Sequence, residues 1–372
     1  MKKMLIISNY RTREMGGGPQ KKPNKKLLRE RGWDIEIGYV PDLSIAGVLK
    51  AIPDLIRQVC CKNIDIIVSH CSPPELHALG YVLKRITGKP WLAEFRDPLV
   101  TNPDVEPGSF SQFQRRVLEK RVVHSANQIA WWENIQMEDG YFSRTYPEMD
   151  RSMFYKIPYL GVGGVNFDKF DRPKAESYDK FTITYAGSFY NGWIEPCRFL
   201  EGVRKYVETH SNDGLQVQFY GDWKDEYQQK VLKEGLEEDV TVYDPVPHEE
   251  IIPVLKKSHL LLYIGGDNPR NRQNISLKMA DYVAAGKPIL GIVDPSFRAG
   301  KFIKREKIGV VAHPENAEAI AEAIETVRSG RFRYNADDDI KRRFDSEATM
   351  DEYASILDSV SKGEHYTGDK NS

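Results

Sequence analysis

The sequence predicts an α/β protein built from two doubly wound parallel sheets. Short apolar runs alternate with amphipathic stretches of helical periodicity along almost the whole chain. Parallel strands need a crossover between them, usually a helix, so this alternation favours parallel sheets over antiparallel ones. The pattern starts again near residue 180, after a glycine-rich stretch, and 372 residues are more than one ordinary hydrophobic core supports. Two domains of comparable size are therefore expected.

Five buried strands are expected in each half of the chain. Those of the first half cover residues 4–8, 34–40, 64–69, 90–95 and 128–132, separated by amphipathic stretches such as 44–61, 74–86 and 110–125. Those of the second half cover residues 181–186, 215–220, 240–244, 259–264 and 288–293. The chain is therefore divided into two Rossmann-like domains over 1–170 and 171–336, a C-terminal helix over 337–361 and a disordered polar tail over 362–372.

The composition indicates a soluble, cytoplasmic protein. Hydrophobic residues make up 40% of the chain and charged residues 29%, and no apolar run approaches the roughly 18 residues of a transmembrane helix. The apolar run after the first lysines is too short for a signal peptide. The four cysteines, at positions 60, 61, 71 and 197, lack the spacing of a zinc site and are expected to be reduced.

The charge is unevenly distributed along the chain. Residues 1–170 hold 25 Lys and Arg against 19 Asp and Glu, whereas the remainder holds 28 against 35. The basic excess lies in residues 1–50, where 11 basic residues face 5 acidic ones. A basic half joined to an acidic half indicates that the first half meets an anionic partner. No basic-aromatic nucleic-acid module is present, so nucleic acid is not expected as that partner.

Candidate ligand-binding residues follow the predicted strands, because open parallel sheets bind ligands outside the carboxyl ends of their strands. After the first strand come Gly16, Gly17 and Gly18. Glycines let the backbone approach a ligand closely, and the next helix offers free amides to an anion. The alternative is a flexible loop without a ligand.

Two further candidates lie at the same edge of the first sheet. His70 follows the third strand, and the string containing Glu94, Arg96 and Asp97 follows the fourth. An Arg-Asp pair before a proline also closes ordinary turns, and a lone histidine is often structural. Both interpretations stay open at this point.

The second half offers a site for a diphosphate. A helix is predicted to begin near Ile275, directly after a strand and a loop that holds Arg270 and Arg272. Its first amides would carry partial positive charge. Lys278 and Asp281 are three residues apart and share a helix face, so the cation can reach phosphate while the carboxylate accepts from sugar or ribose hydroxyls. An ordinary ion pair on a solvated face is the alternative.

Other chemistries find little support in the sequence. Asp337 and Asp339 form a D-x-D string, but they stand where a helix begins, and acidic residues there favour the helix dipole. No serine-histidine-acid set and no zinc-binding string is present. This argues against a hydrolase with its own nucleophile, and no metal is expected.

Several of these strings occur in the same order in one enzyme family. The glycine loop appears as MGGGP, the string after the fourth strand as EFRDPL, and the first strand of the second half ends in YAGSFY. The linker IPYLGVGGVNFDKF and the helix string ISLKMADYVAAGKP complete the set. Over roughly residues 4–360 the chain therefore resembles the GT-B retaining glycosyltransferases of the large family numbered four.

The resemblance implies the GT-B fold, with a cleft between two Rossmann-like domains and a C-terminal helix that packs back on the first. It also implies transfer of a sugar from a nucleotide diphosphate sugar, as co-substrate, with retention and without a metal or other cofactor. Asp281 would bind the ribose, and Lys278 would lie near the phosphates. The implied catalytic residues are Asp97, His70 and Lys278. The implied donor-binding residues are Gly187, Ser188, Arg270, Arg272, Gln273, Asn274, Ile275, Ser276, Lys278 and Asp281, and the implied acceptor and phosphate loop is Gly16, Gly17, Gly18 and Arg96.

The chain departs from the family pattern at three places. The usual pair of glutamates eight residues apart falls on Gln273 and Asp281. The frequent arginine and lysine that follow the second-domain glycine fall on Ser188 and about Trp193. The phosphate charge would then be met by Lys278 and by the arginines of the preceding loop.

The predicted function is transfer to a glycan or lipid-linked acceptor in the biosynthesis of surface glycans or glycoconjugates. Two alternatives stay open. A non-catalytic GT-B subunit that binds a nucleotide or scaffolds a partner is motivated by the amide at Gln273. A nucleotide-sugar epimerase shares the architecture.

The predicted location is the cytoplasm, with weak, salt-sensitive contact to anionic membranes through the first domain. The lysines of residues 21–26 can meet lipid headgroups. The predicted helix over 43–59 carries an apolar stripe, most of which is expected to pack on the first sheet; its residues are Ile45, Val48, Leu49, Ile52 and Ile56.

Overall fold

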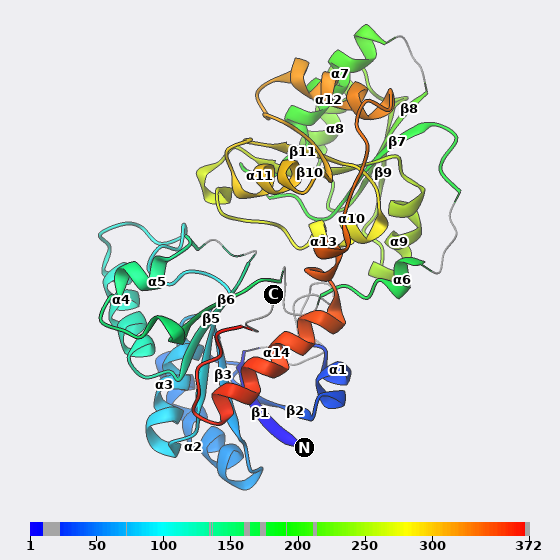
Figure 1. Ribbon diagram of the computed structural model, residues 1–372. Coiled ribbons are helices and arrows are strands. Elements are labelled where there is room, and N and C mark those ends of the chain that lie inside the picture. Colours follow the sequence, from blue (N-terminus) through cyan, green and yellow to red (C-terminus); the bar gives the residue numbers. More distant parts are fainter. Residues whose placement is uncertain are drawn as a thin grey trace. The chain divides into compact units, whose positions relative to one another are not determined.

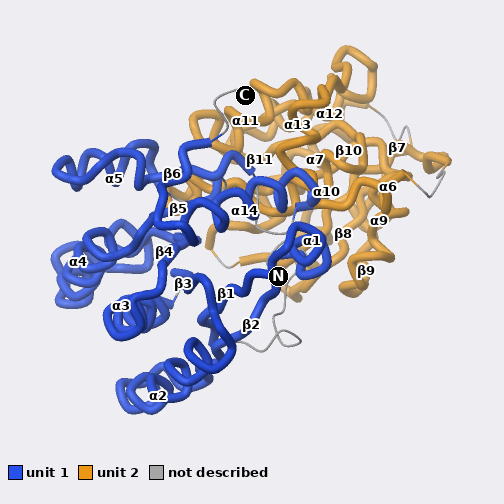
Figure 2. The backbone as a smooth tube through the Cα atoms, turned by 60° about the horizontal axis from the view of Figure 1, so that its bottom comes forward, with its two compact units in different colours: residues 1–164, 346–372 blue, residues 165–345 orange. Residues whose placement is uncertain are grey.

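The computed structural model describes residues 1–9, 23–71, 73–133, 135, 137–159, 164–171, 176–190, 192–210 and 214–368 (Figure 1). The chain forms two units (Figure 2): residues 1–164 together with 346–372, and residues 165–345. The predicted glycine loop at Gly16, Gly17 and Gly18 lies outside the described residues.

The first unit is built on a six-stranded parallel sheet with the strand order β2-β1-β3-β4-β5-β6. Strands β3, β4 and β5 are buried throughout, which explains why they are largely apolar runs, whereas the edge strand β2 alternates between apolar and polar residues. The strands are β1 (Lys2–Ser8), β2 (Trp33–Tyr39), β3 (Ile66–Cys71), β4 (Trp91–Phe95), β5 (Gln128–Trp132) and β6 (Phe154–Ile157).

Helices cover both faces of this sheet, with α2, α3 and α4 on one face and α1 and α14 on the other (Figure 1). Asn24, Ser44 and Ser109 cap three of them, because their side-chain oxygens accept backbone N–H groups of the first turn. The helices are α1 (Lys25–Glu30), α2 (Ile45–Cys61), α3 (Glu75–Thr87), α4 (Phe110–Val123), α5 (Tyr141–Thr145), the 3₁₀ helix η2 (Arg151–Met153) and α14 (Ser346–Ser361).

The second unit repeats the architecture, with the strand order β12-β11-β10-β7-β8-β9, again parallel. Its strands are β7 (Phe181–Ala186), β8 (Leu215–Tyr220), β9 (Val240–Tyr243), β10 (Leu260–Gly266), β11 (Ile289–Val293) and β12 (Gly309–Ala312). Its helices are α6 (Asp168–Asp171), α7 (Cys197–Thr209), α8 (Asp225–Glu234), α9 (His248–Lys257), the 3₁₀ helix η3 (Pro269–Asn271), α10 (Lys278–Ala285), α11 (Arg298–Arg305), α12 (Ala317–Arg328) and α13 (Asp338–Arg342).

The predicted fold class is confirmed. Strands β5, β7 and β8 have the predicted bounds, and the other predicted strands are each found within two residues. The sequence analysis missed β6 and β12, which have four residues each and lie at sheet edges. Short edge strands bury less apolar surface than central ones, so their sequences carry a weaker signal.

The predicted single helix over 337–361 is wrong, because the chain is interrupted after α13. Asp337 does cap this helix, since its carboxylate accepts from the Ile340 amide at 2.9 Å. Beyond it, the Phe344 carbonyl accepts from the Val165 amide at 2.6 Å. This pairing takes the backbone out of the helix, and α14 then begins at Ser346 in the first unit.

The predicted disorder of the tail is wrong for the part that the structure describes. Tyr366 is buried, and its backbone N–H and C=O both bond the side-chain amide of Gln128, at 2.8 and 2.7 Å. Gln128 is itself fully buried on β5. A buried amide requires partners for both of its ends, and the tail supplies them.

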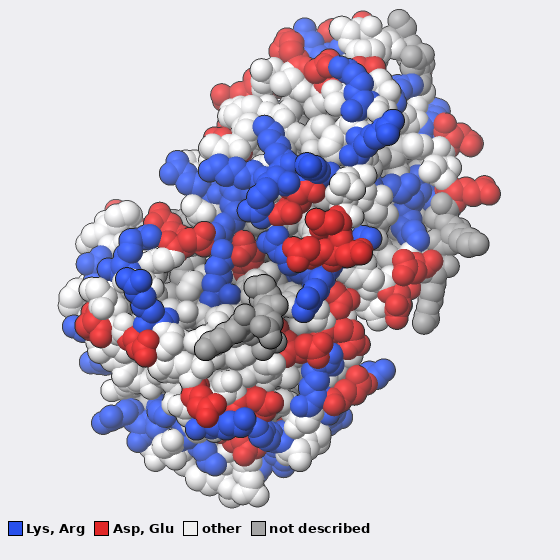
Figure 3. Space-filling model, in the orientation of Figure 1, with Lys and Arg blue, Asp and Glu red and all other residues white. Residues whose placement is uncertain are grey.

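The surface carries charges of both signs. Lys and Arg side chains are interspersed with Asp and Glu over the visible face of each unit (Figure 3). The uneven charge of the sequence therefore does not appear as a face of one sign in this view. Of the helices that the structure describes, none is long and apolar enough to cross a membrane.

Candidate functional site

Helix α10 begins at Lys278, three residues after the predicted start near Ile275. Two turns lead into the helix, since the Met279 and Ala280 amides donate to the Ser276 and Leu277 carbonyls, at 3.0 and 3.1 Å. The Ser276 amide, which the prediction left free for a ligand, donates to the Tyr263 hydroxyl at 3.3 Å. An anion at this edge must therefore rely more on side chains than the prediction assumed.

Lys278 points to the carboxyl edge of the second sheet. Its Nζ lies 3.9 Å from the centre of the Tyr185 ring, and a Cβ at Gly187 would come within 2.8 Å of it. Burial lowers the pKa of Lys278 to about 7, although the charge of Asp222 acts in the opposite direction. Within the described part of the chain, the Lys278 amine forms no hydrogen bond or ion pair. The amine is therefore desolvated, and it has no anionic contact among the described residues.

The loop beside Lys278 needs its glycines. Gly187 has φ of 139°, in the region that favours glycine, and its amide donates to the Tyr220 carbonyl at 2.9 Å. A Cβ at Gly221 would lie 2.2 Å from the Gly187 carbonyl oxygen, so the two loops meet backbone to backbone. Tyr185 fixes Ser188, the residue after Gly187, since the Tyr185 hydroxyl donates to the Ser188 carbonyl at 2.7 Å; the Ser188 side chain is exposed.

The loop after β10 holds the two predicted arginines in different settings. The Arg270 guanidinium stacks over the Trp193 ring, 5.2 Å from its centre, whereas Arg272 is exposed. Asn271 anchors the loop by donating to the Gly265 carbonyl at 2.8 Å, and its buried Oδ1 has no hydrogen-bond partner in the described part of the chain. Of the other predicted donor-binding residues, Ile275 is buried, and Gln273, Asn274 and Ser276 are partly exposed.

Asp281 lies one turn along α10 from Lys278, and its Oδ1 accepts from Nε2 of His248 at 3.0 Å. His248 is the first residue of α9. The structure thus brings Gly187, Lys278 and Asp281 to the carboxyl edge of one sheet and adds His248, a residue that the sequence analysis did not name.

The first unit gathers polar side chains around the fully buried carboxylate of Glu94. One of its oxygens accepts from Arg96 Nε at 2.8 Å and from Trp132 Nε1 at 2.7 Å, and the other accepts from the Tyr353 hydroxyl at 2.9 Å. Burial alone would raise the pKa of Glu94, but the neighbouring Arg96 and His70 outweigh it and hold the pKa well below its usual range.

His70 joins this cluster at the end of β3. Its Nε2 accepts from the Arg96 guanidinium at 3.3 Å, and its Nδ1 faces the Glu94 carboxylate at 3.4 Å. Burial and the Arg96 charge lower the pKa of His70, so the ring is neutral near pH 7. The structure therefore brings His70, Glu94 and Arg96 together, and Asp97 follows them as a partly exposed residue.

Residues 168–344 match the family described as "Glycosyl transferases group 1". This span covers nearly all of the second unit, and with it the Lys278 site. The protein is a glycosyltransferase. The predicted resemblance to this class of enzyme is thereby confirmed. No curated protein matches the sequence.

Solved structures show the same fold. The lipopolysaccharide outer core galactosyltransferase WaaB is 12% identical, with 96% of this chain and 99% of that chain covered and a TM-score of 0.65. HepE from Anabaena, solved with UDP and glucose, is 12% identical over 97% and 98%, with a TM-score of 0.57. A Listeria monocytogenes protein assigned as a UDP-N-acetylglucosamine 2-epimerase is 12% identical over 99% and 100%, with a TM-score of 0.60. At these identities the likeness concerns the GT-B fold alone.

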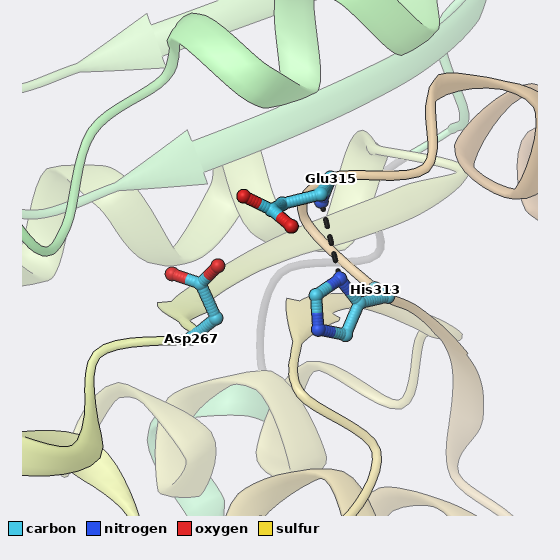
Figure 4. Close-up of side chains that lie close together, drawn as sticks. All are labelled: Asp267, His313 and Glu315. Carbon is cyan, nitrogen blue, oxygen red and sulfur yellow. Dashed lines mark hydrogen bonds between the residues drawn. The ribbon is translucent and has the colours of Figure 1, made fainter.

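One group of possible metal ligands is present among the described residues of the glycosyltransferase. Asp267, His313 and Glu315 lie at the carboxyl edge of the second sheet, with ligand atoms within 4.8 Å of one another (Figure 4). The Glu315 amide, however, donates to Nδ1 of His313 at 3.2 Å. The lone pair of Nδ1 is therefore used as a hydrogen-bond acceptor. In the neutral ring the proton is then on Nε2, so His313 offers no free lone pair to a metal.

The glycosyltransferase also has a cavity of about 550 Å³ within the second unit. It lies at the C-terminal end of α10, whereas Lys278 begins that helix, so it is not part of the Lys278 site. Its lining residues are Phe167, Phe170, Asp171, Lys256, Val283, Ala284, Ala285, Gly286, Lys341, Arg342 and Asp345.

Three residues of these clusters were missed at the sequence level. Tyr185 stands two residues before Gly187 in an extended segment, and this spacing signals a shared face. His248 begins the helix that follows β9. It therefore lies at the carboxyl edge of its sheet, as His70 does in the first unit. Tyr353 lies 259 residues from Glu94 along the chain, and no local signal joins the two.

Proposed function

We propose that the enzyme transfers a sugar from a nucleotide diphosphate sugar, with retention at the anomeric carbon, to a glycan or lipid-linked acceptor in surface glycan biosynthesis. The observation that carries the proposal is the desolvated amine of Lys278 at the carboxyl edge of the second sheet. A desolvated amine that has no anionic contact among the described residues is suited to bind an anion such as a diphosphate. The UDP bound in the HepE structure is in keeping with this choice of donor.

The proposed reaction needs no protein nucleophile. The bond between the anomeric carbon and the phosphate oxygen breaks as the acceptor hydroxyl attacks from the same face, and the hydroxyl proton passes to the leaving phosphate oxygen. Negative charge grows on the diphosphate during this step, and Lys278 stabilises it, assisted by Arg270. The two arginines of the loop and Lys278 replace the cations that the family pattern places on Ser188 and Trp193.

The first unit is proposed to bind the acceptor. Arg96 and Asp97 follow β4 at the carboxyl edge of the first sheet, where open parallel sheets bind ligands. Asp97 is the proposed contact for the acceptor hydroxyl. The buried His70 contributes by holding Arg96, because its Nε2 already accepts from that guanidinium. The loop of Gly16, Gly17 and Gly18 stays a prediction for the phosphate side.

The donor assay is the direct test. Incubation of the protein with UDP-, GDP- and ADP-sugars and a panel of glycan and lipid-linked acceptors should release a nucleoside diphosphate and form an α-linked product from an α-linked donor. Product analysis by NMR reports the anomeric configuration. An inverted product would contradict retention.

The same assay separates the alternatives. Isomerised donor in the absence of any acceptor would identify an epimerase. Nucleotide binding in calorimetry without turnover would identify a non-catalytic subunit. If the protein neither binds nor turns over any donor of the panel, the proposal is rejected.

We also propose peripheral contact with anionic membranes, through a helix other than the predicted one. In α2, Val48, Ile52 and Ile56 pack against the core, and only Ile45 and Leu49 of the predicted stripe are exposed. The larger exposed apolar face belongs to α4. Phe110 and Phe113 are 73% and 62% exposed and stack on each other, 6.4 Å between ring centres.

The charge around this face favours an anionic membrane as its partner. The exposed Val117 continues the apolar face, and Arg116, Lys120 and Arg121 are exposed on the same helix. Basic residues at an anionic surface contribute about 1 kcal/mol each, and aromatic rings insert at the headgroup level. Of the lysines predicted for this role, Lys25 lies 3.6 Å from Asp34 and Lys26 lies 3.9 Å from Glu30, while Lys21 and Lys22 lie outside the described residues.

Liposome co-sedimentation should show salt-sensitive binding to vesicles with 30% phosphatidylserine and none to phosphatidylcholine vesicles. Phe110→Ser/Phe113→Ser should lower the bound fraction several-fold at low salt. Leu232→Ser is the matched control, because Leu232 is an exposed apolar residue of the second unit. Equal recovery of the wild type with both kinds of vesicle would rule out the membrane contact.

A further inference from the structure

His248 and Asp281 form a pair between two neighbouring helices of the second unit. His248 is the first residue of α9, and Asp281 is the fourth residue of α10. The imidazole Nε2 donates to the Asp281 Oδ1 at 3.0 Å. The side chains are 25% and 15% exposed, so both can be reached by a ligand at the carboxyl edge of the sheet.

The surroundings of the pair raise the pKa of His248. The hydrogen bond to Asp281 is the largest influence and raises the pKa of His248, against the effect of burial. Lys169 lowers this pKa and Glu249 raises it, and these two residues pair with each other at 2.8 Å. Because its acceptor is a carboxylate, the hydrogen bond from His248 to Asp281 is charge-assisted, and such bonds are stronger than neutral ones.

The pair bears on the departure from the family pattern at Asp281. Asp281 stands where the family pattern has a glutamate, whose side chain is longer by one methylene. A shorter carboxylate reaches less far and must be held in the right orientation to meet two hydroxyls at once. The hydrogen bond from α9 supplies this orientation before any ligand arrives, so less conformational freedom is lost on binding.

We propose that His248 is a positioning residue of the donor site, which holds the Asp281 carboxylate against the vicinal hydroxyls of the donor ribose. The inference rests on the proposed function, because it requires a nucleotide at the start of α10. His248 itself need not touch the nucleotide. Its effect is specific to the ribose hydroxyls, and this distinguishes it from a general role in packing α9 against α10.

The test compares ribose with a sugar that lacks the hydroxyls. Affinities of the full-length protein for UDP, GDP and ADP are measured by calorimetry, each beside its 2′,3′-dideoxy analogue. The nucleotide that the wild type binds most tightly is used for the comparison. The wild type should bind this ribonucleotide more tightly than its 2′,3′-dideoxy analogue. In His248→Ala this preference should fall about tenfold, while the affinity for the dideoxy analogue stays the same.

Companion variants make the result specific. Asp281→Asn should lose the preference as His248→Ala does, and the double variant should lose no more than either, because the two side chains act as one unit. His248→Gln should retain part of the preference, since its amide can still donate to Asp281. Glu249→Gln is the matched control on the same helix turn and should keep the full preference.

Two outcomes would overturn the inference. Equal weakening of the ribonucleotide and its analogue in His248→Ala would assign His248 a structural role only. An unchanged preference in a folded His248→Ala, with a Tm near that of the wild type, would show that Asp281 needs no positioning. Absence of nucleotide binding in the wild type would reject the proposed function itself, and the inference with it.

Discussion

Lys278→Met is expected to lower kcat/KM for the nucleotide sugar by about 100-fold in a protein that still folds. Methionine keeps the unbranched side chain that packs on the Tyr185 ring but removes the charge. Among the described residues, Lys278 is the cation that lies beside the Gly187 loop. Loss of a cation at a growing negative charge therefore affects the transition state directly.

The stability expected of Lys278→Met follows from the desolvation of the Lys278 amine. The pKa of Lys278 falls from an ordinary 10.5 to about 7, so between these values the unfolded chain holds a proton that the folded protein has lost. Stability contributed by this group therefore rises with pH across that window, and at pH 7 and below the buried charge is unfavourable. The Tm of Lys278→Met in the absence of ligand should accordingly equal or exceed that of the wild type.

The pH dependence of kcat/KM gives an independent check on the role of Lys278. The free enzyme should lose donor affinity as pH rises above about 7, since the amine is then deprotonated. Lys278→Arg keeps its charge at every accessible pH and should remove this decline, whatever its absolute rate. Unchanged kinetics in Lys278→Met would show that the cation has no part in catalysis.

Glu94→Ala is expected to lower the free energy of unfolding of the first unit by about 3 kcal/mol. The substitution leaves the Trp132 indole N–H and the Tyr353 hydroxyl buried without their acceptor. It also removes one partner of Arg96, whose side chain is 22% exposed and can recover part of its hydration. The effect should therefore fall at the lower end of the range for broken buried ion pairs.

Chemical denaturation with a fluorescence readout of the first unit measures this effect. Glu36→Ala is the matched control, because Glu36 forms an exposed ion pair with Lys62 at 2.7 Å, and it should cost at most about 1 kcal/mol. The sign of the pH dependence is fixed by the lowered pKa of Glu94. Its contribution is present above the ordinary glutamate pKa and is lost as pH falls below it, whereas Glu94→Gln should lack this loss. Equal effects of Glu94→Ala and Glu36→Ala would contradict the role given to the buried cluster.

The sequence predicted the fold because the relevant signals are local. Apolar runs such as residues 128–132 and 181–186 are strands that are buried on both faces, and a parallel sheet follows from the helices between them. It also placed Lys278 and Asp281 at a sheet edge, because both follow a strand and a loop by a fixed spacing. What periodicity did not reveal were elements with little buried surface, such as β6 and β12.

The partners of these residues were decided by tertiary structure. Lys278 could have been part of an ordinary surface ion pair with Asp281, but the fold turns it onto Tyr185 and gives Asp281 to His248 instead. Likewise, Glu94 could have closed a turn with Arg96, but α14 returns from the end of the chain and places Tyr353 on its carboxylate. The sequence alone determined which residues reach the carboxyl edges of the sheets, since helix and strand periods are set by neighbours in the chain. Only the tertiary structure decided burial, and with it the lowered pKa of Lys278 and of Glu94, because desolvation depends on side chains that are distant in sequence.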